Sequence, residues 1–147
     1  DTRYNLLDAV FRTPRFWSAE RAVTEKAMEL LSICGLEDSA DVLASSLPYG
    51  RQRKLEIARA LATDMKVLLL DEPAAGMNPT ETAELLSCIH AIRDRFGVAI
   101  LLIEHDMSLV MNICQRIQVI DYGQAIAAGL PEEIARDPKV IAAYLGE

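Results

Sequence analysis

Residues 68–73, three leucines followed by Asp71, Glu72 and a proline, are the part of this sequence best suited to chemistry. An apolar run of this kind is typical of a strand buried on both faces of a parallel sheet, and ligands bind where such strands end. The two carboxylates repel each other, so the position favours a cation. We expect Asp71 to hold Mg²⁺, directly or through water, and Glu72 to orient or deprotonate an attacking water. An ordinary acidic turn is the alternative.

A glycine at the start of a predicted helix forms a second candidate site, in residues 47–53. Gly50 exposes backbone N–H groups and the positive end of the helix dipole, which suits a phosphate. Arg51, Arg53 and Lys54 add positive charge nearby. The alternative is a plain turn that opens a helix with a solvated basic face.

His105 follows a second apolar run, residues 98–103. It emerges at the same edge of the sheet as Asp71 and Glu72 if the two strands are parallel. A histidine near a γ-phosphate can donate a hydrogen bond to it and sense its loss. A purely structural histidine is the alternative, and we interpret His90, which lies in mid-helix without a partner at ligand spacing, as structural.

Helices and strands alternate in the stretch that carries these residues. We expect helices over residues 18–34, 50–63, 79–96 and 107–114, and strands over 66–70 and 98–103. Asn78 is the predicted N-cap of the third of these helices and Gly97 its end. Alternation of this kind predicts a parallel α/β sheet with right-handed crossovers.

The two ends of the chain are predicted to differ from this middle. Residues 117–121 and 124–128 predict a hairpin, and Pro131 opens a last helical segment. The first 45 residues are helical, with a short helix over residues 5–11 and a break at Thr13-Pro14. We expect Phe11, Phe16 and Trp17 to pack within this small helical lobe.

Composition excludes several classes of protein. The 147 residues are 51% hydrophobic with a net charge of −7, which fits one globular domain with a core. The longest apolar runs fall far short of the roughly 20 residues that cross a bilayer, and a pI of about 4.9 argues against non-specific nucleic-acid binding. Three cysteines without a CxxC pair predict neither a disulfide framework nor a zinc site, and fit a reducing compartment.

Four short motifs follow one another along the chain: Gly50-Arg51-Gln52-Arg53, Leu70-Asp71-Glu72-Pro73, Gly76-Met77-Asn78 and Glu104-His105-Asp106. Their order and spacing resemble the ATPases of ABC transporters, in which they correspond to the signature motif, Walker B, the D-loop and the switch histidine. Within that family the chain is most similar to the ATPases of branched-chain amino-acid importers, over residues 47–50, 55–59, 71–79, 103–107 and 143–147.

The resemblance implies an α/β P-loop NTPase fold whose parallel sheet is flanked by helices. Residues 1–63 correspond to the helical subdomain, and residues 64–147 to the C-terminal half of the ATPase core with its hairpin and last helices. It implies that Glu72 and His105 are catalytic and that Asp71 holds the metal. The residues implied to contact the nucleotide are Leu47, Pro48, Tyr49, Gly50, Arg51 and Gln52. Those implied at the dimer seam are Gly76, Met77 and Asn78.

This sequence departs from the family at several positions. The family's signature usually reads Leu-Ser-Gly-Gly-Gln, whereas Pro48, Tyr49 and Arg51 stand here for its serine, first glycine and glutamine. Since Pro48 offers neither a hydroxyl nor an N–H, phosphate contact is expected to depend on Gly50 and the amides that follow. Asn78 replaces the D-loop aspartate of many relatives. No GxxxxGK[ST] sequence, the phosphate-cradling Walker A motif, occurs in the chain.

The function implied is that of a cytoplasmic ATP-hydrolysing subunit on the inner face of the membrane, with ATP and Mg²⁺ as its cofactors. Its implied partners are a second ATPase subunit and the membrane permease subunits that the helical lobe contacts, with no nucleic acid and no transmembrane segment of its own. Branched-chain amino acids are the expected cargo. Without Walker A we expect a fragment, the acceptor half of an ATP site, that is inactive alone.

Two alternatives stay open. The C-terminal ATPase lobe of an SMC or Rad50-like DNA-repair protein carries the same motifs without Walker A, but reaches them through a long coiled coil. Residues 1–46 show no sustained heptads, and the chain is acidic. The other alternative is an interaction module that docks on a permease without catalysis.

Overall fold

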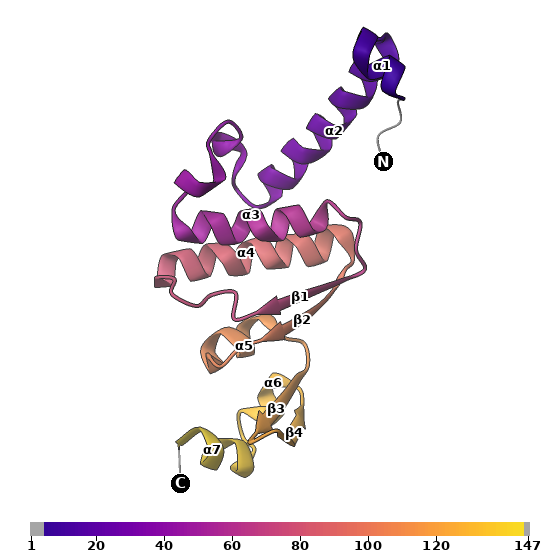
Figure 1. Ribbon diagram of the computed structural model, residues 1–147. Helices are drawn as coiled ribbons and strands as arrows, with labels where there is room; N and C mark the ends of the chain where they lie inside the picture. The colour runs from indigo at the N-terminus through magenta and orange to yellow at the C-terminus, as the bar shows by residue number, and fades with distance from the viewer. Residues whose placement is uncertain (1–4, 146–147) are drawn as a thin grey trace. The chain divides into compact units, whose positions relative to one another are not determined.

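The computed structural model describes residues 5–145, which fall into two compact units (Figure 1). The first unit comprises residues up to 68 together with residues 74–99, and the second comprises residues 69–73 and 100 onward. The sequence analysis places a boundary between two domains after residue 63. That boundary stays a prediction, because the two units are defined by contacts within this chain and do not test it.

Helices make up most of the first unit. They are α1 (Leu6–Phe11), α2 (Pro14–Ile33), α3 (Tyr49–Leu61) and α4 (Pro79–Phe96), with short 3₁₀ turns η1 (Glu37–Ser39) and η2 (Ala44–Ser46). The predicted break before Pro14 is confirmed, and Thr13 also caps α2 by accepting a hydrogen bond from the Phe16 N–H at 3.4 Å. The capping prediction for α4 is confirmed: Asn78 and Glu81 form a reciprocal capping box, and Gly97 ends the helix at φ 60°.

The core of the first unit lies where the end of α2 packs against α3 and α4, which run side by side in Figure 1. Leu85 and Ile92 of α4 have no exposed surface, and Ile57 and Leu61 of α3 are each 5% exposed. The middle of α2 is exposed over residues 21–29. The helices are therefore held together by one apolar layer rather than along their full length.

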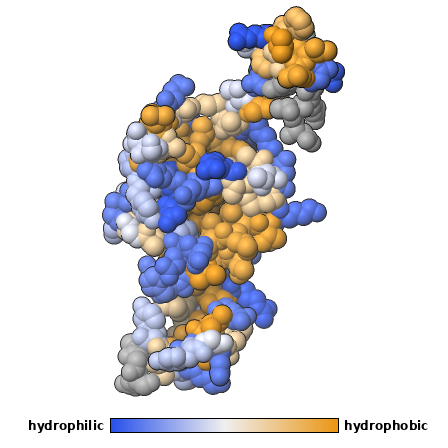
Figure 2. All heavy atoms as spheres, in the orientation of Figure 1, coloured by the Kyte–Doolittle hydropathy of each residue, from blue (hydrophilic) through white to orange (hydrophobic). Residues whose placement is uncertain are grey.

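The aromatic residues at the N-terminal end do not pack as predicted. Phe11 is 74% exposed and Trp17 is 55% exposed, and Trp17 forms a T-shaped aromatic pair with Phe16, with ring centroids 5.4 Å apart. Figure 2 shows apolar side chains at the surface of α1, where Leu6 and Leu7 are also exposed. The prediction was wrong because α1 has no buried residue against which these rings could pack.

Strands β1 (Val67–Asp71) and β2 (Ala99–Ile103) pair in parallel. The Ala99 N–H donates to the Lys66 carbonyl at 3.0 Å at one end, and the Glu72 N–H donates to the Ile103 carbonyl at 2.9 Å at the other. Since both strands therefore run in the same direction, their carboxyl ends meet at one edge. The prediction that Asp71, Glu72 and His105 emerge at the same edge of the sheet depended on these two strands being parallel.

The prediction that both strands are buried on two faces was wrong for the residues the structure describes. Leu68 and Leu70 are buried, but Val67 and Leu69 between them are 53% and 69% exposed. On β2, Leu101 is 58% exposed. Alternate side chains of a strand point to opposite faces, so only one face of this pair is covered by the elements described.

The second unit contains α5 (Met107–Ile113), β3 (Ile117–Asp121), β4 (Gln124–Gly129), α6 (Pro131–Ile134) and α7 (Pro138–Leu145). The predicted hairpin is confirmed: β3 and β4 pair antiparallel around Tyr122-Gly123, with an irregularity between Val119 and Ile120. Val110, Ile117, Ile134 and Val140 form its small core.

Candidate functional site

Glu72 stands directly after β1 in an unusual backbone conformation. Its φ of +42° lies in the left-handed region, which non-glycine residues rarely adopt. The hydrogen bond from its N–H to the Ile103 carbonyl holds that conformation at the end of the strand pair. Strain of this kind concentrates at functional sites, where the surrounding structure enforces it. The sequence offered no signal for this conformation.

His105 and Glu72 are brought together at this strand edge, as the sequence predicted for parallel strands. His105 Nδ1 lies 3.2 Å from Glu72 Oε1, and both side chains are more than half exposed. This distance permits a hydrogen bond from an Nδ1–H to the carboxylate. The pair therefore has the geometry of two polar groups that could both face a reacting phosphate and a water molecule.

Glu104 is a neighbour that the sequence reasoning did not single out. Its side chain is 3% exposed, its Oε2 accepts a hydrogen bond from the His105 N–H at 3.3 Å, and His105 Nδ1 lies 3.9 Å away. The imidazole of His105 is thus close to two carboxylates. The only sequence signal for Glu104 was its place directly before a histidine at a strand end. Because side chains alternate along a strand, this position could have been used to predict that Glu104 points inward.

Asp71 is exposed at the last position of β1. Among residues 5–145 no group of three or more His, Cys, Asp and Glu side chains converges on a metal position. Mg²⁺ is usually held by one or two carboxylates together with water and substrate phosphates, so a single accessible carboxylate fits this ion. Asp71 could supply that carboxylate.

The predicted signature segment leads into the N-terminus of α3. Leu47 is buried, Tyr49 is 45% exposed, and Gly50 is buried in the first turn. Gln52 fixes the segment, since its side-chain amide donates to the Leu47 carbonyl at 2.8 Å. Pro48 occupies the N-cap without a side-chain hydrogen bond, so the first N–H groups of α3 receive no side-chain cap from it.

The basic residues near the start of α3 are paired with acidic residues of the same unit. The sequence analysis expects them to add positive charge near Gly50, but their charges are already balanced by these partners. The Arg51 guanidinium donates to both carboxylate oxygens of Asp38, at 3.0 and 3.1 Å, and to the Ser39 hydroxyl at 2.6 Å. Hydrogen bonds from Arg51 and Ser39 lower the pKa of the Asp38 carboxyl below its usual value.

Arg53 and Lys54 are paired in the same way. Arg53 donates to Glu56 and to the Tyr49 hydroxyl, both at 2.9 Å, and its guanidinium lies 5.2 Å from the centroid of the Tyr49 ring. Lys54, which is buried, donates to Glu84 at 2.8 Å, and this bond lowers the pKa of the Glu84 carboxyl. Sequence reasoning missed the partners of Arg51 and Lys54 because Asp38 and Glu84 lie 13 and 30 residues away along the chain.

The structure brings the signature segment next to the predicted D-loop residues. A Cβ atom added to Gly76, which has a φ of +76°, would lie 3.8 Å from the Tyr49 ring. A Cβ atom added to Gly50 would lie 3.0 Å from Glu81 Oε1. The Glu81 carboxylate also accepts a hydrogen bond from the Asn78 N–H. It therefore lies between the start of α3 and the start of α4. Met77 completes this turn by donating its N–H to Ala74.

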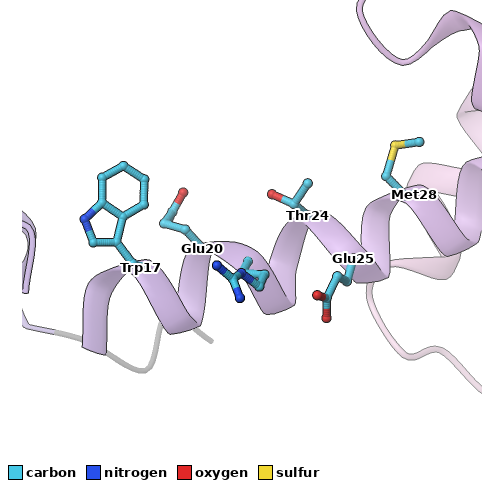
Figure 3. A pocket seen from close by; sticks show the side chains of 6 residues that line it. Trp17, Glu20, Thr24, Glu25 and Met28 are labelled. Atoms are coloured by element: carbon cyan, nitrogen blue, oxygen red, sulfur yellow. The ribbon is translucent and has the colours of Figure 1, made fainter. Parts of the chain in front are cut away.

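The candidate residues therefore form two groups, one in each unit. Residues 47–52 and 76–78 lie together in the first unit, and Asp71, Glu72 and His105 lie together in the second. An open hollow along α2 holds none of them; the side chains that line it all come from one helix (Figure 3), namely Trp17, Glu20, Arg21, Thr24, Glu25 and Met28. No helix within residues 5–145 is long and apolar enough to span a bilayer.

Comparison with known families and proteins gives a consistent result. A family described as "ABC transporter" matches residues 3–75, which include the signature segment, Asp71 and Glu72. A family described as "Branched-chain amino acid ATP-binding cassette transporter" matches residues 126–147. His105 and residues 76–78 lie between these two matches.

Two curated relatives align over nearly the whole chain. The high-affinity branched-chain amino acid transport ATP-binding protein LivG of Salmonella typhimurium is 49% identical over 142 residues, and BraF of Pseudomonas aeruginosa, which bears the same description, is 48% identical over 143 residues. Each alignment covers 97% of this chain and 56% of the relative. The chain thus spans a little over half the length of the curated relatives it matches.

A solved structure agrees with these alignments. The ADP conformation of MJ1267, an ATP-binding cassette of an ABC transporter, superposes with a TM-score of 0.75 at 29% identity, and the match covers 98% of this chain and 57% of that one. Sequence and fold point to the same conclusion: the chain belongs to the ATP-binding cassette (ABC) transporter family.

Proposed function

We propose that this chain supplies the acceptor half of the ATP site in the ATPase subunit of an importer for branched-chain amino acids. The observation that carries the proposal is the contact between His105 and Glu72 at the carboxyl edge of two parallel strands. Similarity to LivG and BraF, whose names specify branched-chain amino acid transport, supports the cargo.

In the proposed reaction Glu72 orients a water molecule in line with the γ-phosphate of ATP and accepts a proton from it. His105 donates a hydrogen bond to a γ-phosphate oxygen through a ring N–H. Asp71 would hold Mg²⁺, which neutralises phosphate charge when bound. The Glu72 carboxylate is exposed and close to the end of β1, so water can reach it.

The first turn of α3 would bind the γ-phosphate held by a second ATPase subunit. Its N–H groups and helix dipole are the attractive groups, because Arg51, Arg53 and Lys54 are already paired. Tyr49 lies near the Gly76 turn and would transmit the state of this phosphate to the dimer seam. Membrane permease subunits are the proposed partners of the helical lobe.

A chimera tests the catalytic part of the proposal. This chain would replace the matching 142 residues of Salmonella typhimurium LivG, and hydrolysis of Mg·ATP would be measured. We expect turnover in the chimera and a loss of about 10²-fold or more with Glu72→Gln, with ATP binding retained. Glu132→Gln, an exposed carboxylate of α6, is the matched control and should retain turnover. Normal hydrolysis in the Glu72→Gln chimera would remove Glu72 from the proposed role.

Transport and the half-site are tested separately. Leucine uptake by cells that carry the chimera in place of LivG tests the cargo; hydrolysis without uptake would overturn the cargo and leave the ATPase proposal standing. Calorimetry of the 147-residue chain with Mg·ATP tests the half-site, and we expect no binding. Stoichiometric binding would show a complete phosphate site within this chain.

A further inference from the structure

Glu104 is a buried carboxylate at the end of β2 to which the proposed function gives no role. Its side chain is 3% exposed, whereas those of His105 and Glu72 are 79% and 51% exposed. All three residues belong to the second unit. Burial of a carboxylate is costly unless neighbouring groups stabilise its charge, so the groups next to Glu104 indicate its role.

A single oxygen of Glu104, Oε2, faces His105 in two ways. It accepts a hydrogen bond from the His105 main-chain N–H at 3.3 Å, and it lies 3.9 Å from Nδ1 of the imidazole. The same Nδ1 lies 3.2 Å from Glu72 Oε1. One ring nitrogen of His105 therefore faces two carboxylates, one buried and one exposed.

We propose that Glu104 is a positioning residue that, together with Glu72, holds His105 in the tautomer with its hydrogen on Nδ1. A neutral imidazole carries a hydrogen on one nitrogen and a lone pair on the other, and the partners of each nitrogen decide which form is present. A lone pair on Nδ1 would be repelled by both carboxylates, whereas an Nδ1–H is attracted by both. The role of Glu104 in catalysis rests on the proposed function, whereas the tautomer does not.

The two carboxylates differ in how easily they can leave the histidine. Glu72 is half exposed, and in the proposed reaction it turns to a water molecule and accepts a proton, which cancels its charge. Glu104 is buried, and its Oε2 also binds the main-chain N–H of His105, so this carboxylate cannot move away without breaking that bond. Glu104 therefore keeps the Nδ1–H in place while Glu72 acts on water.

Nε2 is then the ring nitrogen of His105 that contacts the γ-phosphate. Because Nδ1 keeps its hydrogen, Nε2 can donate a hydrogen bond only when the ring is doubly protonated. The positive charge of that ring is attracted by both carboxylates and by the phosphate, and such charge-assisted hydrogen bonds are the strong ones. Glu104 thereby determines which ring atom meets the phosphate.

Heteronuclear NMR of the imidazole rings in the 147-residue chain tests the tautomer. The chain has two histidines, and His90 in α4 has no ion-pair partner among residues 5–145, so it provides the reference ring. The pH is raised until both rings are neutral, and the nitrogen chemical shifts then identify which ring nitrogen keeps its hydrogen. We expect the hydrogen of His105 on Nδ1. A hydrogen on Nε2 of His105 would overturn the proposal.

Variants separate the contribution of Glu104 from that of Glu72. Glu72→Gln leaves the buried Glu104 carboxylate facing Nδ1 and should keep the hydrogen on Nδ1. Adding Glu104→Gln to that variant should lower the ratio of the Nδ1–H form to the Nε2–H form by about 5-fold or more. An unchanged ratio in the double variant, or loss of the Nδ1–H form in Glu72→Gln alone, would overturn the proposal. The unmodified chain and Glu72→Gln decide the question even if the double variant fails to fold.

Asp106→Asn is the matched control for the change of charge. Asp106 follows His105 directly, is exposed, and caps α5 by accepting the N–H groups of Ser108 and Leu109 at 2.9 and 3.3 Å. Asparagine keeps a capping oxygen and removes one negative charge next to the histidine. The tautomer of His105 should stay unchanged in this variant. A shift as large as that produced by Glu104→Gln would show a general effect of charge and would overturn the specific role of Glu104.

Hydrolysis by the LivG chimera tests the role in catalysis. Glu104→Gln should lower kcat by about 10-fold with the KM for ATP unchanged, since the ring loses its orientation for hydrolysis rather than for ATP binding. An unchanged kcat would overturn the positioning role. Hydrolysis that survives Glu72→Gln would instead refute the proposed function and leave the Nδ1–H tautomer standing. An Nε2–H tautomer in a chain whose chimera hydrolyses ATP would refute only the role of Glu104.

Discussion

The left-handed backbone at Glu72 makes a prediction about stability that can be tested without any activity. A non-glycine residue in this region is destabilised by roughly 1–2 kcal/mol, because its Cβ approaches the following carbonyl oxygen. Glycine avoids this contact but loses about 0.5–1 kcal/mol more conformational entropy on folding. We therefore expect Glu72→Gly to be more stable than Glu72→Ala by about 1 kcal/mol.

Comparison of these two variants isolates the backbone contribution. Neither variant has a carboxylate, so both lose the contact with His105, and the remaining difference is the Cβ atom at φ +42°. Ala143→Gly in α7 is the matched control, since residue 143 is exposed and helical in the same unit. There glycine should be the less stable residue, by up to about 1 kcal/mol.

Urea unfolding followed by circular dichroism provides the assay. For a small protein with an m-value of about 1–3 kcal/mol/M, a difference of 1 kcal/mol moves the midpoint by about 0.3–1 M. The midpoint of Glu72→Gly should lie above that of Glu72→Ala, whereas Ala143→Gly should lower the midpoint. If glycine is the less stable residue at both positions, then Glu72 is not strained, and the argument that this residue is held in a costly conformation for function fails.

Three further predictions concern the packing and charges of the first unit. Leu85→Ala should lower the free energy of unfolding by about 2–5 kcal/mol in the same urea assay, because Leu85 has no exposed surface. Lys54→Met should change it by less than about 1 kcal/mol, since the stem is kept and a buried charge is removed; Glu84→Gln should destabilise more, because the buried Lys54 ammonium then loses its ionic partner. The pKa of the Asp38 carboxyl is lowered in the folded chain, so this group stabilises the fold above its unfolded pKa, and that stabilisation is lost as the pH falls through the folded pKa. Asp38→Asn should therefore reduce the loss of stability below about pH 4. Urea midpoints measured from pH 7 to pH 3 check this.

Local sequence signals predicted the ends of α4 and the hairpin turn well, whereas α2 begins at Pro14 rather than at residue 18 as predicted. Asn78 followed by proline and then Glu81 predicted the start of α4, and Gly97 predicted its end; both are confirmed. The hairpin at Tyr122-Gly123 is confirmed as well. Each of these features depends on residues within four positions of one another, so the physical cause lies within the local sequence.

Predictions that required long-range information were less successful. An apolar run such as residues 67–70 indicates a strand, but it cannot show whether one face or both are covered, and here Leu69 is exposed while Leu68 and Leu70 are buried. The pairing of Arg51 with Asp38 is likewise invisible in the local sequence. Such features depend on how the elements pack against one another. The spacing of residue types along a single sequence does not specify that packing.

The paired charges around α3 change how phosphate binding by this segment should be understood. The sequence suggests that three basic residues attract phosphate, but each already has a carboxylate partner at 2.8–3.1 Å. The Glu81 carboxylate adds negative charge next to Gly50. A phosphate at this helix start would therefore be attracted chiefly by uncapped N–H groups, whose effect falls off within one turn. Such a site distinguishes a phosphate that is already held in place from one free in solution. This is the behaviour required of a surface that closes on a nucleotide bound elsewhere.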